Sequence, residues 1–139
     1  MRQNNKQRFA ATARRFGAAL LAALLFACAP EAQTIAPADL VDYLEKGKVG
    51  RTFNLVDLRP QEAFAALHLP GAINVPYERL ATDRLLFLDG RPVIFYDETA
   101  PDLARLADAV GARLPRNVVF LEGGFSGWRA ARLPVAKGA

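Results

Sequence analysis

Residues 37–139 predict an α/β fold, with a mostly parallel sheet covered by helices on both faces. Strand-like and helix-like segments alternate along this part of the chain, which is typical of parallel strands joined by helical crossovers. Two of the strand-like segments, 92–96 and 118–121, are continuously apolar. Such runs are typical of strands that are buried on both faces of a sheet.

The first half of this region predicts helices and strands in alternation. Pro37 and Asp39 begin a helix, because proline suits the first turn and an acidic group complements the positive end of the helix dipole. Gly47 ends that helix. The segments expected next are a strand at 53–58, a helix at 60–67, a turn at 69–72, a strand at 73–75 and a helix at 77–85.

The second half continues the alternation. After strand 92–96, residues 101–114 carry apolar side chains at helical spacing and predict a long helix. Strand 118–121 follows, and a glycine turn at 123–124 precedes a last helix at 125–131. We also expect a first short strand near residue 34.

The N-terminal residues 1–27 resemble an export signal. A cationic stretch precedes the apolar run 16–27 (FGAALLAALLFA), which is shorter than the roughly 20 residues that span a bilayer and fits a signal peptide. The run ends in Leu-Phe-Ala-Cys28, which resembles the lipobox of bacterial lipoproteins. The resemblance implies cleavage before Cys28, diacylglyceryl transfer to its thiol and acylation of the new amino terminus. The alternative is an ordinary cleaved signal in which Cys28 is incidental.

Lipidation at Cys28 predicts a location in the bacterial cell envelope, with the domain facing the periplasm. Residues 28–36 then form a short tether, of which 29–36 extend at most about 29 Å. In familiar Gram-negative lipoproteins an aspartate after the lipidated cysteine favours the inner membrane. Ala29 therefore favours the outer membrane. The membrane, through the lipid anchor, is the first predicted partner, and an envelope protein of unknown identity is the second.

Composition excludes several classes of function. The formal net charge is +4, but five basic and no acidic residues lie within 1–27, which leaves 13 basic and 14 acidic residues in 28–139. A nucleic-acid partner is not expected, because it would need a basic patch in the domain itself. The single cysteine and the single histidine, His68, provide neither a disulfide nor a recognisable metal motif. We expect no cofactor and no metal.

Three segments together resemble the rhodanese homology domain. Residues 57–64 (DLRPQEAF) and 68–76 (HLPGAINVP) resemble its first signature, and 123–128 (GGFSGW) followed by 133–135 (LPV) resembles its C-terminal signature. The resemblance covers about residues 34–135. It implies a rhodanese-like fold, with a sheet of about five strands between helices.

The loop after strand 92–96 departs from the family pattern. In active members this loop reads Cys-x-x-Gly-x-Arg, the cysteine carries a persulfide or attacks a phosphate, and backbone N–H groups cradle the anion. The same six positions here are Asp97, Glu98, Thr99, Ala100, Pro101 and Asp102. The resemblance therefore implies a degenerate active-site loop with no catalytic residue.

The chemistry of loop 97–102 favours a structural role. A bound oxyanion would face carboxylates, and Pro101 removes one N–H donor. The pair Thr99 and Asp102 predicts a capping box, in which each side chain accepts the backbone N–H of the other. One alternative is Asp97 as nucleophile or general acid, although no recognisable partner group is adjacent to it in the sequence. Another is a Ca²⁺ site on the three carboxylates, which the helix dipole disfavours.

Other polar and aromatic residues are interpreted as structural. They are Trp128 in the core, His68 as a hydrogen-bonding turn residue, Asp57 and Arg59 as a polar pair, and Arg129 and Arg132 as solvated surface of the last helix.

The sequence thus predicts a membrane-anchored, non-catalytic rhodanese-like domain. It would act as a binding or regulatory module that holds a protein or a small non-acidic ligand near loop 97–102. One alternative is a sulfurtransferase-type enzyme that uses a non-cysteine or partner-supplied group. Another is a structural envelope lipoprotein.

Overall fold

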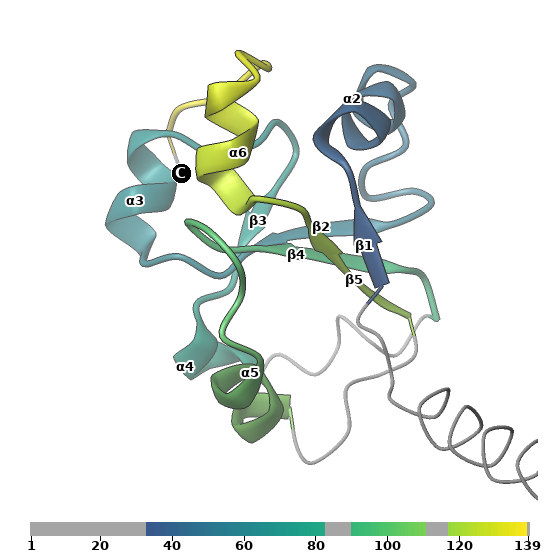
Figure 1. Cartoon of the computed structure of the whole chain (residues 1–139). Helices are drawn as coiled ribbons and strands as arrows, with labels where there is room; N and C mark the ends of the chain where they lie inside the picture. Colours follow the sequence, from purple (N-terminus) through teal and green to yellow (C-terminus); the bar gives the residue numbers. More distant parts are fainter. Residues whose placement is uncertain (1–32, 83–89, 111–116, 139) are drawn as a thin grey trace, which may run out of the picture. The chain divides into compact units, whose positions relative to one another are not determined.

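The computed structural model describes residues 33–82, 90–110 and 117–138, which contain one five-stranded sheet with the strand order β1-β5-β4-β2-β3. Every neighbouring pair of strands is parallel (Figure 1). The strands are β1 (Gln33–Ile35), β2 (Asn54–Asp57), β3 (Ile73–Asn74), β4 (Val93–Tyr96) and β5 (Val118–Leu121). The predicted α/β class and the parallel sheet of about five strands are confirmed, including the short first strand.

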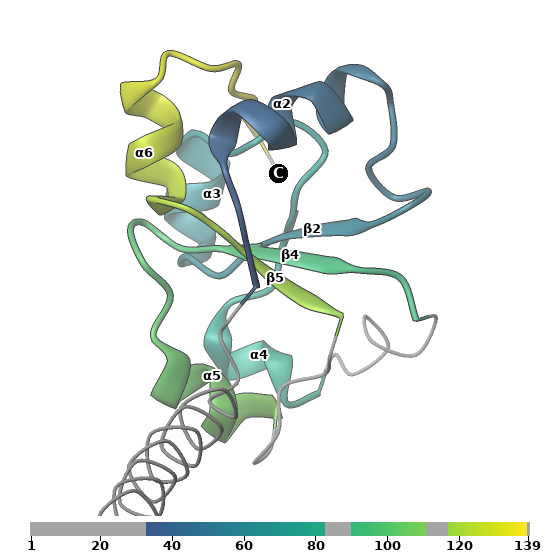
Figure 2. The same cartoon turned by 45° about the vertical axis from the view of Figure 1, so that its right-hand side comes forward.

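Helices cover both faces of the sheet. They are α2 (Pro37–Glu45), α3 (Gln61–Ala66), α4 (Tyr77–Leu80), α5 (Leu103–Val110) and α6 (Gly124–Ala130). Helices α2, α3 and α6 lie on one face, and α4 and α5 lie on the other (Figure 2).

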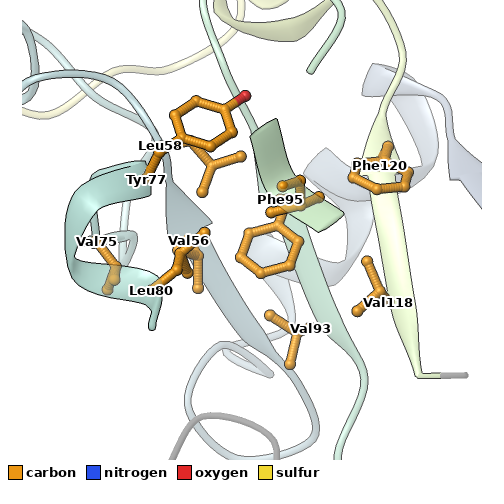
Figure 3. Close-up of a cluster of buried hydrophobic side chains, with 10 residues drawn as sticks. Val56, Leu58, Val75, Tyr77, Leu80, Val93, Phe95, Val118 and Phe120 are labelled. Carbon is orange, nitrogen blue, oxygen red and sulfur yellow. The ribbon is translucent and has the colours of Figure 1, made fainter. Parts of the chain in front are cut away.

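Two apolar clusters, one on each face, hold the layers together. Successive residues of β4 alternate between them, since Phe95 belongs to one cluster and Tyr96 to the other. The first cluster includes Val56, Val93 and Phe95 together with Leu106 of α5 (Figure 3). Each strand of the sheet centre therefore buries both of its faces, which explains the continuous apolar runs in the sequence.

Two of the helices are shorter than the sequence predicts. Helix α2 matches its prediction, and Gly47 adopts a positive φ of 63° just after it. The helix expected at 77–85 ends at Leu80 and is followed by a turn through Thr82, and residues 83–89 lie outside the described residues. The helix expected from residue 101 begins at Leu103.

The predicted signal peptide 1–27 and Cys28 lie outside the described residues, as does the tether up to residue 32. Within the part of the chain that the structure describes, no helix is long and apolar enough to cross a bilayer.

Because all strands are parallel, the segments that follow β2, β4 and β5 lie together where the strands end. We call this side of the sheet, formed by the carboxyl ends of the strands, the carboxyl edge. It brings together residues 58–60, loop 97–102 and the turn 122–123, which are far apart in the sequence. In parallel sheets this edge is where ligands bind.

Candidate functional site

Asp97, the first residue of loop 97–102, is held by two hydrogen bonds at the end of β4. The Tyr77 hydroxyl donates to its Oδ2 at 2.8 Å, and the Glu98 N–H donates to its Oδ1 at 2.7 Å. Burial, and then the hydrogen bond to Asp97, raise the pKa of Tyr77. Tyr77 therefore stays protonated at neutral pH and remains a donor to the carboxylate.

The start of α5 is capped by Asp102 and Tyr77. Asp102 Oδ1 accepts the Arg105 N–H at 3.0 Å, which makes Asp102 the N-cap residue. The Asp102 N–H donates to the Tyr77 hydroxyl at 3.0 Å. The predicted capping box between Thr99 and Asp102 is therefore wrong. A side chain from α4, twenty-five residues away in the sequence, satisfies the N–H that Thr99 was expected to satisfy.

Glu98 connects the loop to the buried layer beneath it. Its carboxylate accepts from Arg59 Nη1 at 3.3 Å and from Ser126 Oγ at 2.8 Å. Arg59 is buried, and its guanidinium lies 3.8 Å from the centre of the Phe125 ring. The three loop carboxylates thus have different partners and do not converge on one point. Among the described residues no group of three or more metal-ligating side chains occurs.

The backbone of the loop packs closely on the first turn of α6. The Phe125 and Ser126 N–H groups each donate at 2.9 Å, to the carbonyls of Asp97 and Glu98 respectively. Gly124 has a φ of 59°, and a Cβ there would lie 2.2 Å from the Thr99 carbonyl oxygen. Only glycine permits this approach, so the loop backbone packs directly against the first turn of α6.

A cavity of about 390 Å³ opens beside Asp97. Among the described residues, nine that lie in or next to β2, β4, α3, α4 and α5 line it: Leu58, Pro60, Gln61, Glu62, Pro76, Tyr77, Glu78, Asp97 and Arg105. Three of the lining side chains are carboxylates. Arg105 is the single cation among them, and it pairs with Glu78. The cavity is therefore acidic in character.

Comparison with known proteins decides the family. The pattern of the rhodanese-like domain matches residues 36–131, more than half of the chain. The chain belongs to the rhodanese-like domain family.

Two solved structures and one curated relative place this rhodanese-like domain among its neighbours. The BH2092 protein of Bacillus halodurans is 27% identical with a TM-score of 0.63, over 76% of this chain and 77% of that one. A thiosulfate sulfurtransferase of Pseudomonas aeruginosa is 30% identical with a TM-score of 0.56, over 78% of this chain and 20% of that one.

The curated relative is an HTH-type transcriptional regulator of Mycobacterium tuberculosis. It is 42% identical over 111 residues, which are 76% of this chain and 45% of the regulator. The chain spans about half the length of the curated relatives it matches. The rhodanese-like domain is thus only a part of those longer proteins.

The structure confirms the structural roles predicted for the signature residues. Asp57 is fully buried and binds Arg59 through the Arg59 N–H, Nε and Nη2. His68 stacks on the Phe64 ring at 3.8 Å, and its Nδ1 lies 2.8 Å from the Phe64 carbonyl oxygen.

The aromatic and basic residues near the C-terminus are also where we expected them, with one exception. Trp128 is fully buried and its indole N–H donates to the Pro134 carbonyl at 2.8 Å. Arg129 and Arg132 are exposed, although Arg132 lies beyond the end of α6, with a φ of 56°.

Sequence reasoning missed the residues that complete the site. Tyr77 holds the loop from α4, and Glu62, Glu78 and Arg105 line the cavity. One signal was available for Tyr77, because it comes shortly after the predicted strand 73–75 and hence near the same sheet edge as loop 97–102. No local pattern marks the other three.

Proposed function

We propose that this chain is a non-catalytic rhodanese-like module, anchored in the bacterial cell envelope, that acts by binding. The observation that carries the proposal is Asp97. A sulfur carrier must be a thiolate, and the first loop position holds a carboxylate instead. The chain's single cysteine, Cys28, precedes the domain.

The contacts of the loop support binding over sulfur transfer. The Glu98 and Asp102 N–H groups already donate to oxygens of this protein, so they are not free for a substrate oxyanion. The carboxylates that line the cavity would repel an anionic sulfur donor such as thiosulfate. A small non-acidic ligand, or a side chain of a partner protein, fits the cavity better.

The relative in Mycobacterium tuberculosis supports a regulatory use of such a domain, since that protein is named a transcriptional regulator. The apolar run that ends at Cys28 supports the anchor and a periplasmic location. Ala29, in place of an aspartate after the cysteine, favours the outer membrane over the inner.

A sulfurtransferase assay tests the absence of catalysis. The full-length protein should form thiocyanate from thiosulfate and cyanide no faster than a heat-denatured sample. The Pseudomonas aeruginosa sulfurtransferase provides the positive control. A rate above background that Asp97→Asn abolishes would contradict the proposal.

Restoring the thiol gives a sharper version of this test. Asp97→Cys should stay near background, because the negative charges of Glu98 and Asp102 in the same loop disfavour a thiolate and raise the pKa of the new thiol. We expect turnover only when Ala100→Gly and Asp102→Arg are added. Circular dichroism checks that each variant is folded, since Asp102→Arg also removes the N-cap. Rapid turnover by the single variant would mean that the loop retains a working anion cradle.

Lipid labelling tests the anchor. Radioactive fatty acid should enter the full-length protein in cells and should not enter Cys28→Ser. Membrane fractionation should place the labelled protein in the outer membrane. Equal labelling of both proteins would contradict lipidation at Cys28.

Photo-crosslinking in whole cells tests the binding site. A benzophenone amino acid at Gln61, which lines the cavity, should capture a partner. The same group at Asp108, an exposed residue of α5 outside the cavity, is the matched control. Capture from both positions alike would argue against binding at the cavity.

A further inference from the structure

A second cavity, of about 330 Å³, lies beside α2 and toward the ends of β2 and β4 that are remote from loop 97–102. Ile35, Phe53 and Ile94 are among its apolar lining residues, and Tyr43 and Lys48 also line it. We call it the amino-edge groove, because five of the eight described residues that line it precede β2 or β4 or belong to the first two residues of β4 or β5: Thr52, Phe53, Pro92, Ile94 and Val119. Figure 2 shows the segment between α2 and β2 at the right-hand ends of the strands, and the segment between β4 and α5 at the left.

The groove presents an aromatic ring and a lysine side by side. Tyr43 is 41% exposed and packs edge-to-face on Phe53, with ring centres 6.1 Å apart. Lys48 Nζ lies 4.8 Å from the centre of the Tyr43 ring. Exposed tyrosines and long basic side chains beside an apolar surface are typical of the interface between membrane and water.

The described segments next to the groove are rich in basic residues. Between α2 and β2 and directly before β4, the described part of the chain carries Lys46, Lys48, Arg51 and Arg91, and the last turns of α2 add Asp42 and Glu45. Asp42 is paired with Lys46. The carboxyl edge exposes acidic side chains on loop 97–102 and at Glu122, together with Arg105 beside the cavity.

The chain joins the fold at the same edge. Gln33 is the first residue of β1, two residues before the groove-lining Ile35. Cys28 is five residues before Gln33, so the connecting chain reaches at most about 18 Å. A lipid on Cys28 would therefore hold the amino edge near a bilayer.

We propose that the amino-edge groove docks on the surface of an anionic bilayer. Tyr43 enters the interfacial region, and the basic residues around it face the lipid phosphates. Loop 97–102 then points away from the membrane, where a partner can reach it. This docking rests on the membrane anchoring in the proposed function, and the experiment separates the two.

The test attaches one fluorophore to the full-length protein, either in the amino-edge groove or, as a control, on α5 next to loop 97–102. NBD is attached at Tyr43→Cys or, as a control, at Leu103→Cys on α5, where the native side chain is 48% exposed. Each protein is reconstituted into vesicles of brominated phosphatidylcholine, with or without phosphatidylglycerol. Bromine should quench the label at 43 strongly when phosphatidylglycerol is present and should barely affect the label at 103. Lys48→Gln or Arg51→Gln should each lower the docked-to-undocked ratio about fivefold.

Vesicle flotation and label stoichiometry separate the two proposals. A protein that floats with a single label per chain, but is quenched equally at 43 and 103, contradicts docking while leaving the anchor intact. Docking is also contradicted if quenching of the label at 43 does not depend on phosphatidylglycerol and is not reduced by Lys48→Gln or Arg51→Gln. A protein that takes a second label at Cys28 and stays off the vesicles contradicts the anchor and the docking together. Protection of the label at 43 by dimerisation in detergent, without lipid, would assign the groove to a second copy of the chain and overturn the proposal.

Discussion

Two aspartates at the carboxyl edge lie one register position apart, at the ends of neighbouring strands, and behave differently. Asp57 ends β2 and pairs in register with Tyr96, the residue before Asp97. Asp57 is fully buried against the Arg59 guanidinium, whereas Asp97 is half-buried beside an open cavity. The buried aspartate belongs to the framework of the rhodanese-like fold, and the half-buried one belongs to a surface that can change without loss of the fold.

Desolvation explains the contrast. A buried ion pair leaves an uncompensated charge in the interior when one partner is removed, and that charge is costly. Arg59 depends on this pairing. Burial would lower the pKa of its guanidinium, but the hydrogen bonds and charge of Asp57 more than offset that effect and raise it. Around Asp97, water can replace a lost hydrogen bond, so substitutions there cost less.

The largest expected effect is the loss of the buried pair. Asp57→Ala should lower the free energy of unfolding by about 3–5 kcal/mol. Asp97→Ala should lower it by only about 1 kcal/mol, since it removes hydrogen bonds at a half-buried site. Urea unfolding followed by circular dichroism measures both. Equal losses would show that the two aspartates do not differ as proposed.

The next effect concerns the contact between the loop and α6. Gly124→Ala should cost about 2–4 kcal/mol, because it combines a positive φ with a clash against the Thr99 carbonyl. Gly127→Ala is the matched control in the same helix, where a Cβ approaches nothing closer than 3.4 Å. It should stay within about 1 kcal/mol of wild type. The prediction fails if the two variants have the same urea midpoint.

The pH dependence of stability should report Tyr77. Burial and Asp97 raise its pKa above the usual value of about 10, so the folded protein holds this proton more tightly than the unfolded chain does. The resulting stability is complete below pH about 10 and is lost, by up to about 1.4 kcal/mol per pH unit, as the pH rises further. Tyr77→Phe should therefore show a shallower decline in alkaline solution. Unfolding measured across that range would contradict this if both proteins declined in parallel.

The smallest effect distinguishes the observed helix cap from the predicted one. Asp102→Ala should cost about 1 kcal/mol, the usual effect of losing an N-cap. Thr99→Ala should stay within about 0.5 kcal/mol of wild type, because Thr99 does not accept the Asp102 N–H. Thermal unfolding of the two variants gives the comparison. A larger loss of stability for Thr99→Ala than for Asp102→Ala would indicate that Thr99 does cap the helix.

Most of the fold was predictable because its signals are local or periodic. The continuous apolar run at 118–121 matches β5 residue for residue, and the first turn of α2 follows from Pro37 and Asp39. The parallel sheet follows from the alternation of elements. The start of α5 was less predictable, because the Asp102 N–H that precedes it donates to Tyr77 of α4, twenty-five residues away.

The candidate site was predictable only in its position. The spacing of the signatures located loop 97–102, and the adjacency of Asp57 and Arg59 indicated their pairing. Nothing in the sequence shows that Glu62, Tyr77 and Glu78 share one cavity, and only the packing of α3 and α4 against the carboxyl edge brings them together. The distribution of charge between the two edges was equally hidden, because it depends on where each loop lies in space.

By itself, the sequence determined the class of fold, the order of its elements and the absence of a thiol from the domain, since these depend on residue identity and period. Tertiary structure decided what the loop carboxylates contact and which N–H groups remain free. Several of those contacts join residues twenty or more positions apart, as in the bonds from Tyr77 to Asp97 and Asp102. Hydrogen bonds of this kind form only after parallel strands align their carboxyl ends, and no local pattern encodes that alignment.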